Sequence, residues 1–446
     1  MTEIPRVWFR GSARLSWLIV AGTLVVFTEA IRRVIIPLHG QTQLALIAAW
    51  ILIFGYNVTV YAISWLEKPF TVTPRQQGVL DSLRVTVVIP VFNEDPAALD
   101  LCIRGVMEQE RLPQEVLVID DGSAVTYPGV RMYWEQTGPA GVSFGWIRQQ
   151  NTGKRHAQAK AFRHSSSAHI YITLDSDTVL ERRAIAEGLK PFADRRVTSV
   201  AGVEMGLNMK RNWLTRIAAC RQLIWQVTQC AAQSVRGQVL VNRGTFALYR
   251  GDVVRRYLAA YESETFFGRP VSMSDDSYLT LFSLLEGRTV QQPTAVQFTL
   301  YPENLSHHVR QWMRWMRGST VRSIWRIRYL PVFSFGWLFT VASLWSLFVS
   351  TSVTIVSLAY WHAGLHVIPL MLWSAGAFAY AGSMRIFQYR RSDLSRADVL
   401  DTFCACVLTV AWSMTFLKVL RLYSVFTCKK AAAGWGTRQE KAEVAV

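Results

Sequence analysis

The chain has 446 residues, 51% of them hydrophobic, and it carries a formal net charge of +17. This composition excludes a disordered chain, a fibrous repeat and a small secreted disulfide scaffold. Because long uncharged stretches separate the basic residues, the charge indicates a lipid bilayer as a partner and no nucleic acid.

Two apolar segments come first and predict a helical hairpin across a bilayer. Residues 15–31 are apolar except for Glu29, and residues 38–66 contain no Asp, Glu, Lys or Arg. A membrane-spanning helix needs about 20 apolar residues, so each segment is long enough to cross. Arginines precede the first segment and predict a cytoplasmic N-terminus.

The middle of the chain alternates short apolar runs with helical patterns. The runs predict strands over residues 84–92, 115–119, 144–148 and 170–174, and the helical patterns cover residues 97–109, 156–165 and 278–286. Buried strands that alternate with helices are typical of a parallel α/β sheet, which binds ligands at the carboxyl ends of its strands. The motifs GxGxxG, GxxxxGK(S/T), GxSxG and HExxH are absent, so dinucleotide, P-loop, hydrolase-elbow and zinc-protease sites lack support.

Apolar sequence returns towards the C-terminus. Residues 329–384 contain no charged side chain and predict two spans, and the arginine-rich loop 385–396 after them predicts a cytoplasmic turn. A third segment has an uncharged core of only residues 402–417. If it spans, the tail ends outside, and if it is re-entrant or interfacial, the tail stays inside. We favour a cytoplasmic tail because of a C-terminal motif given below.

Asp175-Ser176-Asp177 follows the strand predicted over residues 170–174. Two carboxylates at alternate positions can bind one hard cation such as Mg²⁺ or Mn²⁺, and that cation stabilises a diphosphate leaving group. The alternative is a solvated acidic turn, because the DxD motif is short and common.

Two more polar clusters indicate a nucleotide site. Asp120 and Asp121 follow the strand over residues 115–119, where carboxylates can accept hydrogen bonds from a base or a ribose. Lys154 and Arg155 end the sequence Asn-Thr-Gly-Lys-Arg before a helix, where cations and backbone N–H groups can bind phosphate. The alternatives are a plain Asp-Gly turn and a basic loop.

Two motifs lie further along the chain. Asp275 and Asp276 are paired carboxylates, an arrangement that raises the pKa of one partner and suits a general base. The alternative is a helix start with acids in its first turn. Gln311, Arg314 and Trp315 belong to a segment rich in arginine and tryptophan, which is also typical of an amphipathic helix on lipid headgroups.

The order of these motifs resembles one family. An acidic strand end, then NxGKR, DxD, a DD pair and QxxRW between two membrane blocks is similar to the processive family 2 glycosyltransferases, such as the cellulose, chitin and hyaluronan synthases. The resemblance is closest to the hyaluronan synthases and the nodulation chitooligosaccharide synthases. It extends from about residue 10 to residue 438, and the segments 213–216, 231–234, 275–280 and 434–438 carry it further.

The resemblance implies a GT-A domain, which is an α/β fold with a Rossmann-like mixed sheet. This domain would lie on the cytoplasmic face of a multi-pass protein of the plasma membrane. The implied division is residues 1–70 for an N-terminal transmembrane hairpin, 82–305 for the GT-A domain, 306–330 for amphipathic interface helices, 331–428 for C-terminal transmembrane helices and 429–446 for a cytoplasmic tail. The transmembrane helices would form the channel through which a polymer leaves.

The resemblance also implies roles for single residues. The nucleotide would be bound by Asp120, Asp121, Lys154, Arg155 and Asp175, with Trp435 and Arg438 closing over it. Asp175 and Asp177 would place Mg²⁺ or Mn²⁺, chiefly through Asp177. Asp276 would be the catalytic base, and the acceptor and diphosphate end of the site would consist of Asp275, Gln311, Arg314 and Trp315.

The leading hypothesis for the reaction is inverting transfer from UDP-GlcNAc and UDP-glucuronate to a growing hyaluronan chain. Alternatives are a chitin-type product from UDP-GlcNAc alone, non-processive transfer to a lipid acceptor, and an inactive channel or scaffold. The QxxRW motif argues against a lipid acceptor, and the complete set of carboxylates argues against an inactive protein.

Two positions depart from the family's usual pattern. Ser277 follows the DD pair where arginine is common, and Arg243-Gly244-Thr245-Phe246 replaces a loop that usually reads close to SGPL. In the family this loop lies near the acceptor sugar, so we expect Arg243 and Phe246 to affect acceptor choice, product length or the polymer made.

Overall fold

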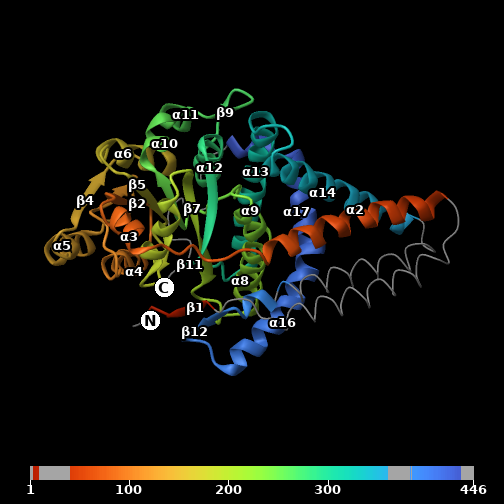
Figure 1. Cartoon of the computed structure of the whole chain (residues 1–446), viewed down its shortest axis with the longest axis horizontal. Coiled ribbons are helices and arrows are strands. Elements are labelled where there is room, and N and C mark those ends of the chain that lie inside the picture. Colours follow the sequence, from red (N-terminus) through yellow and green to blue (C-terminus); the bar gives the residue numbers. More distant parts are fainter. Residues whose placement is uncertain (1–3, 10–40, 360–381, 383, 433–446) are drawn as a thin grey trace.

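The computed structural model of the chain describes residues 4–9, 41–359, 382 and 384–432. Figure 1 shows an α/β domain from which apolar helices project at one end. The strands are β1 (Val7–Phe9), β2 (Val85–Val91), β3 (Glu115–Asp120), β4 (Ser143–Arg148), β5 (Ile170–Leu174), β6 (Val179–Leu180), β7 (Val197–Gly206), β8 (Phe246–Arg250), β9 (Thr265–Phe266), β10 (Arg269–Pro270), β11 (Arg288–Thr299) and β12 (Tyr389–Arg391). The α-helices are α2 (Gln41–Ser64), α3 (Pro74–Asp81), α4 (Pro96–Met107), α5 (Pro128–Thr137), α6 (Lys154–His164), α7 (Ala184–Leu189), α8 (Trp213–Trp225), α9 (Ala231–Val235), α10 (Gly251–Arg256), α11 (Leu258–Glu262), α12 (Asp275–Glu286), α13 (Leu305–Tyr329), α14 (Phe335–Ala359), α16 (Arg396–Trp412) and α17 (Lys418–Phe426).

The main sheet has the strand order β4-β3-β2-β5-β8-β7-β11-β6. Strands β2 to β5 are parallel, which confirms the four strands predicted from the apolar runs. β8 runs antiparallel to both of its neighbours, β5 and β7, and β6 runs antiparallel to β11, so the sheet is mixed. The carboxyl ends of β3, β5 and β7 therefore meet at one edge, where acidic side chains follow the strands.

The alternation of side chains along β2 explains the two layers of helices. Val85, Val87 and Ile89 pack with α4 and α7 on one face of the sheet. Val88 points the other way and packs with α6 and α12. Both faces are buried, and this accounts for the continuous apolar run in the sequence.

Segments far apart in the sequence meet on the α/β domain. β1 pairs with β12, and the Arg391 guanidinium there donates to the Gly206 carbonyl at the end of β7 over 2.7 Å. Arg385 donates to the Ser64 carbonyl at the end of α2 over 2.6 Å. The β1–β12 pair thus contacts the domain at β7, and the end of α2 lies beside Arg385.

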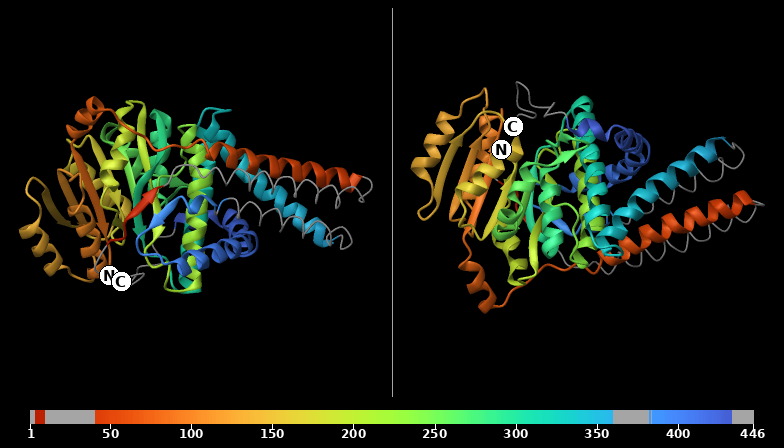
Figure 2. Two further views of the ribbon diagram at one scale, coloured as in Figure 1. Left: turned by 60° about the horizontal axis from the view of Figure 1, so that its bottom comes forward. Right: turned by 90° about the horizontal axis from the view of Figure 1, so that it is seen from above.

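Helices α2 and α14 project together from the domain, as Figures 1 and 2 show. A hydrogen bond of 2.9 Å joins Tyr56 on α2 to Ser343 on α14. Among the described residues, Phe335–Ser352 and Arg396–Phe426 are helical segments long and apolar enough to cross a membrane. The predicted span over residues 15–31 and the second span within 329–384 lie outside the described residues.

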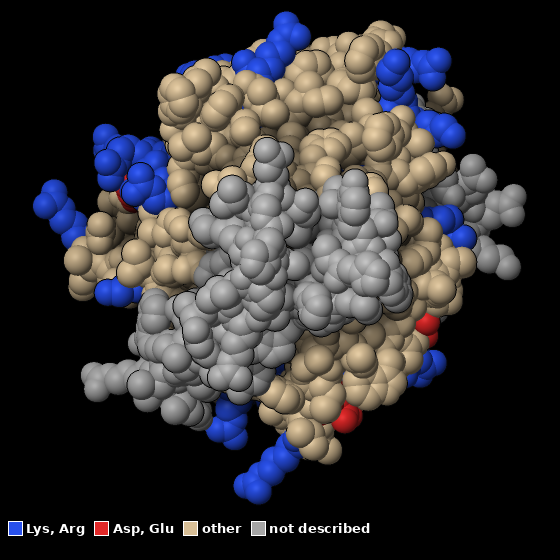
Figure 3. All heavy atoms as spheres, turned by 90° about the vertical axis from the view of Figure 1, so that its right-hand side faces the viewer, with Lys and Arg blue, Asp and Glu red and all other residues tan. Residues whose placement is uncertain are grey.

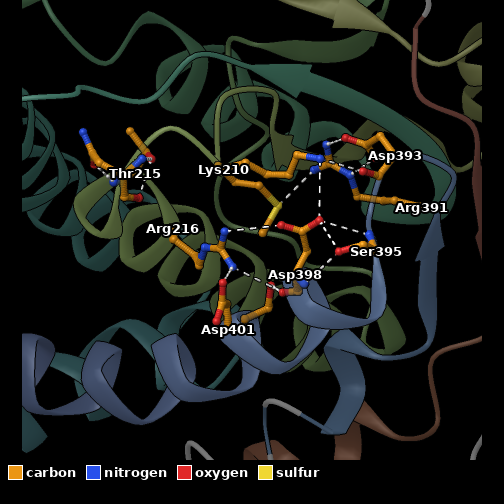
Figure 4. Close-up of polar contacts among 11 residues, drawn as sticks. Lys210, Thr215, Arg216, Arg391, Asp393, Ser395, Asp398 and Asp401 are labelled. Atoms are coloured by element: carbon orange, nitrogen blue, oxygen red, sulfur yellow. Dashed lines mark hydrogen bonds and ion pairs between the residues drawn. The ribbon is translucent and has the colours of Figure 1, made fainter.

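The third C-terminal segment forms one helical rod. α16 continues through a π-helical turn, Ser413–Leu417, into α17. In Figure 1 this rod runs across the direction of α2 and α14, along the edge of the domain. Figure 4 shows how α16 is attached: Arg216 of α8 lies 3.0 Å from Asp401 and 3.6 Å from Asp398. At the other end, the Lys429 ammonium lies 4.6 Å from the centre of the Phe267 ring.

Candidate active site

Asp121 fixes the loop that precedes α6. Its carboxylate accepts the backbone N–H groups of Thr152 at 3.0 Å and Gly153 at 2.8 Å. Gly153 has φ of 97°, a left-handed conformation that glycine adopts without strain, and α6 begins at the next residue. Asp121 and Lys154 line one cavity at the ends of the parallel strands, which we call the small cavity.

Asp120 points elsewhere. Its carboxylate accepts the Ser123 N–H at 2.9 Å and lies 3.3 Å from the Arg148 guanidinium. It is buried and is absent from the walls of both cavities described below. Adjacent residues at a strand end point to opposite sides, so the structure separates the two predicted ligands Asp120 and Asp121.

The DxD motif forms a turn directly after β5. The Thr178 N–H donates to the Asp175 carbonyl over 3.0 Å, and the Ser176 hydroxyl donates to buried Glu94 over 2.6 Å. Asp175 and Asp177 instead line the small cavity. Two carboxylates suit a Mg²⁺ or Mn²⁺ ion that completes its shell with water and phosphate oxygens, so these residues fit the predicted cation.

Lys154 joins the DxD turn to the DD pair. Its ammonium lies 2.6 Å from Asp175 Oδ1 and 3.2 Å from Asp275 Oδ2. Burial opposes the charge of Lys154, but the charges of Asp175 and Asp275 outweigh this effect and raise its pKa. A fixed positive charge therefore stands between the two acidic motifs.

The DD pair begins α12, and the pKa values of its two acids shift in opposite directions. Burial raises the pKa of Asp276, and the charge of Asp275 adds to it, giving a value of about 6. Burial acts on Asp275 in the same direction, but the charges of Lys154 and Arg155 lower its pKa. The Asp276 carboxylate accepts the Gly244 N–H at 3.1 Å. One acid therefore stays ionised, while its neighbour can take up a proton near neutral pH.

Arg155, a predicted nucleotide ligand, is absent from both cavity walls. It forms an ion pair of 2.9 Å with Glu264, which also pairs with Arg322 at 2.8 Å, and all three side chains are buried. Arg155 donates to the Met273 carbonyl and Arg322 to the Ser274 carbonyl, at 3.3 and 3.4 Å. Arg155 thus supports the loop before Asp275. Of the two predicted basic ligands of the nucleotide, only Lys154 lines the cavities.

The QxxRW motif lies on α13. Gln311, Arg314 and Trp315 are three and four residues apart, so they share a helix face, and all three line the small cavity. Trp312 and Met316 are buried against the rod formed by α16 and α17. The helix therefore lines a cavity and also packs as an amphipathic element.

A second cavity of about 660 Å³ leads away from the carboxylates. Six residues line both cavities: Lys154, Asp175, Glu204, Thr245, Arg314 and Trp315. At its near end the larger cavity is bounded by Asp275 and Asp276, and at its far end by α14 and α17. The far walls carry hydroxyl groups and apolar side chains, among them Thr340, Ser343, Ser346, Leu347, Ser350 and Met414. The carboxylates thus face a space that reaches the projecting helices.

The altered loop lies partly in this space. Arg243, Gly244 and Thr245 line the larger cavity, whereas Phe246 begins β8 and is completely buried in the core. Any effect of Phe246 on acceptor choice must therefore be indirect, through the packing of this loop. Ser277 donates its hydroxyl to Asp276 Oδ1 over 3.1 Å, so a neutral donor contacts the acid at this departure.

Sequence reasoning missed Glu204 and Trp225. Glu204 lies near the end of β7, lines both cavities and accepts the Thr245 hydroxyl at 3.0 Å and the Tyr301 hydroxyl. The signal was an acid at the end of a β-branched run over residues 197–206. No such signal marks Trp225, which lies on a helix. Trp435 and Arg438 lie outside the described residues.

Comparison with known proteins identifies the family. The family described as "Glycosyltransferase like family 2" matches residues 83–318. A hyaluronan synthase of Streptococcus pyogenes is 30% identical over 397 residues, which cover 87% of this chain and 90% of that protein. The chain belongs to glycosyltransferase family 2. It is a glycosyltransferase, and the predicted GT-A-like fold with a mixed sheet is confirmed.

Two further matches are a curated relative and a solved structure. An N-acetylglucosaminyltransferase of Azorhizobium caulinodans is 33% identical over 238 residues, which cover 53% of this chain and 59% of that protein. Among solved structures, a mannosyltransferase from Pyrobaculum calidifontis in complex with GDP-Man and Mn²⁺ superposes with a TM-score of 0.49 and 20% identity, over 83% of this chain and 97% of that chain.

Proposed function

We propose that this glycosyltransferase polymerises UDP-GlcNAc and UDP-glucuronate into hyaluronan and passes the chain into the membrane. The observation that carries the proposal is the larger cavity, which begins at the DD pair and ends between α14 and α17. A soluble transferase that releases its product has no need of such a path. The extended identity to hyaluronan synthase supports the choice of polymer.

The chemistry assigned to the site is inverting transfer. The Asp276 carboxylate accepts the proton of the acceptor hydroxyl, whose oxygen forms a bond to the anomeric carbon of the donor sugar. The bond between that carbon and the diphosphate oxygen breaks, and UDP leaves. Lys154 supplies fixed positive charge beside the place of the diphosphate, and Arg314 and Trp315 hold the acceptor in line.

The nucleotide subsite is assigned to the small cavity. Asp121 lines this cavity and fixes the loop before α6. Asp175 and Asp177 would hold Mg²⁺ or Mn²⁺ in the same cavity. When bound, the cation adds positive charge to the leaving diphosphate. Gln311 closes the cavity from α13.

The catalytic domain is assigned to the cytoplasmic face of the plasma membrane. β1 pairs with β12, which contacts β7 through Arg391, and the end of α2 at Ser64 contacts Arg385. The described residues that flank each apolar block thus lie close together, as two hairpins require. Figure 3 shows the face from which the helices project, with Lys and Arg side chains around its visible rim and few acidic ones. Such a rim suits the anionic headgroups of the cytoplasmic leaflet.

A chitin-type product from UDP-GlcNAc alone is the second candidate. It is favoured by the identity of 33% to an N-acetylglucosaminyltransferase over 238 residues. The two candidates differ in whether UDP-glucuronate is required.

Sugar incorporation by membranes that contain the protein distinguishes them. Each donor is supplied alone and then both together, with Mg²⁺ or Mn²⁺, and the product is sized and digested. Long polymer that requires both donors and is cut by hyaluronidase supports the proposal. Product from UDP-GlcNAc alone that resists hyaluronidase and is cut by chitinase establishes the second candidate instead.

A further inference from the structure

The larger cavity is unequally charged along its length. At the DD pair, acids and Lys154 balance one another. Beyond it the wall carries basic residues from several elements: Arg221, Arg243, Arg326, Lys418 and Arg421. Among the described residues that line this deeper part, Glu204 is the acid that faces them, and it stands at the entrance shared by both cavities.

Arg243 is placed in the cavity wall by its neighbours. Its guanidinium lies 4.8 Å from the centre of the Trp225 ring, which holds the group in one orientation. Its nearest carboxylate, Glu204, is 3.8 Å away and already accepts two hydroxyl groups. Its contact with the Gln222 side-chain oxygen is long, at 3.5 Å. The guanidinium thus keeps donors for another acceptor.

Arg221 stands on the same wall. Its guanidinium lies 5.9 Å from the centre of the Trp312 ring, and no described carboxylate lies within ion-pair distance of it. Burial lowers the pKa of Arg221 to about 10, and the charge of Arg243 contributes to the shift. The two arginines line one cavity and their charges oppose each other, so an anion bound beside both of them is stabilising.

We propose that Arg221 and Arg243 bind the carboxylate of an acidic sugar unit in the growing chain. The planar fork of donors on arginine matches a carboxylate and recognises it in a fixed orientation. The inference rests on the proposed function and adds to it a subsite that recognises the charge of the sugar. Arg243 belongs to the loop that departs from the family's usual pattern, at residues 243–246.

Oligosaccharide binding by the full-length, detergent-solubilised protein tests the inference without any sugar transfer. A hyaluronan oligosaccharide is compared with a neutral chitin oligosaccharide of equal length, at low and at physiological salt. We expect Arg243→Gln and Arg221→Gln each to weaken binding of the acidic ligand by about tenfold or more, with little change for the neutral one. Raising the salt concentration should weaken binding of the acidic oligosaccharide only.

Arg236→Gln is the matched control, because Arg236 is exposed and lies outside the cavity wall. UDP affinity shows whether each variant is folded. If either Arg243→Gln or Arg221→Gln fails this check, the remaining variant tests the inference. Equal losses for both ligands, or no loss for the acidic one, overturn the inference. Hyaluronan synthesis that persists with such a result leaves the proposed function standing. Absence of polymer from both donors, by contrast, overturns the function itself.

Discussion

The protonation state of Asp276 should control the rate of the proposed reaction. Its pKa of about 6 arises from burial and from the neighbouring charge of Asp275. A base acts only when it is deprotonated, so activity should fall as the pH drops through this value. The family resemblance alone proposes Asp276 as the base, and the structure adds that its pKa is raised to about 6.

We expect Asp276→Asn to abolish sugar transfer while UDP binding remains, because the amide cannot take up the hydroxyl proton. Asp275→Asn should retain part of the activity and move the acidic limb of the pH profile to lower pH, because the charge that raises the pKa of Asp276 is lost. Initial rates measured across the pH range check both results. Transfer by Asp276→Asn at the parent rate would show that another group is the base.

The second prediction at this scale concerns Asp177. Asp177→Ala should remove the dependence of UDP binding on Mn²⁺, because one of the two DxD carboxylates that line the small cavity is lost. Calorimetric titration of UDP with and without Mn²⁺ checks it. The matched control is Asp120→Asn, since Asp120 is absent from both cavity walls. An unchanged effect of Mn²⁺ in Asp177→Ala would remove this residue from the metal role.

At the scale of elements, Glu264 joins three parts of the fold. It stands just before β9 and pairs with Arg155 of α6 and Arg322 of α13, which is completely buried. Both arginines also bind backbone carbonyls just before the DD pair. The start of α12 is therefore positioned by an ion network that does not line the cavities.

We expect Glu264→Gln to destabilise the protein by about 3–5 kcal/mol, because two buried cations lose their counter-charge. Sugar transfer should fall as well, since the loop before Asp275 loosens. Glu262→Gln is the control: Glu262 pairs with the more exposed Arg163, and its loss should cost about 1 kcal/mol or less. Thermal unfolding in detergent measures both. Equal stability of the two variants would contradict the positioning role.

The sequence predicted the elements that have a strong local signal. β2 to β5 and α4 were expected within a few residues, because continuous apolar runs and a proline-led helix start determine them. β7, β8 and the long β11 were not predicted. Their pairing depends on residues more than forty positions apart, as in the contact of Ala201 with Ala247, and no local pattern records such a partner.

The site was predicted in the same uneven way. Motifs identified Asp175, Asp177 and the DD pair, which line the cavities as expected. They also selected Asp120 and Arg155, whose side chains point elsewhere, because a motif carries no information on side-chain direction. Glu204 required knowledge of which strand ends beside β8.

At the scale of the whole molecule, the ends of the rod α16–α17 bear on topology. It starts beside Arg216 of the domain and ends beside Phe267 of the domain. A helix that crosses a bilayer once leaves its ends on opposite sides. An interfacial position therefore agrees with these contacts, although the segment has the length and composition of a span.

The larger cavity gives a prediction at this scale. Ser346→Trp should fill the cavity beside α14 and shorten the polymer, while UDP release from the donor continues as short products form. Phe348→Trp is the control on the same helix, because Phe348 is exposed and outside the wall. Product sizing by gel electrophoresis together with a UDP-release assay measures both. Full-length product from Ser346→Trp would show that the polymer takes another route.

The antiparallel strand β8 has a consequence for how such enzymes diversify. It separates β5, which ends in the DxD turn, from β7, which ends near Glu204, and its leading loop contributes Arg243. If the proposed function holds, mutations in that loop and in β7 should change which sugar is accepted without disturbing the strands that carry the nucleotide motifs. We therefore expect such enzymes to evolve new products on one inherited donor chemistry, through changes at this one strand junction of the sheet.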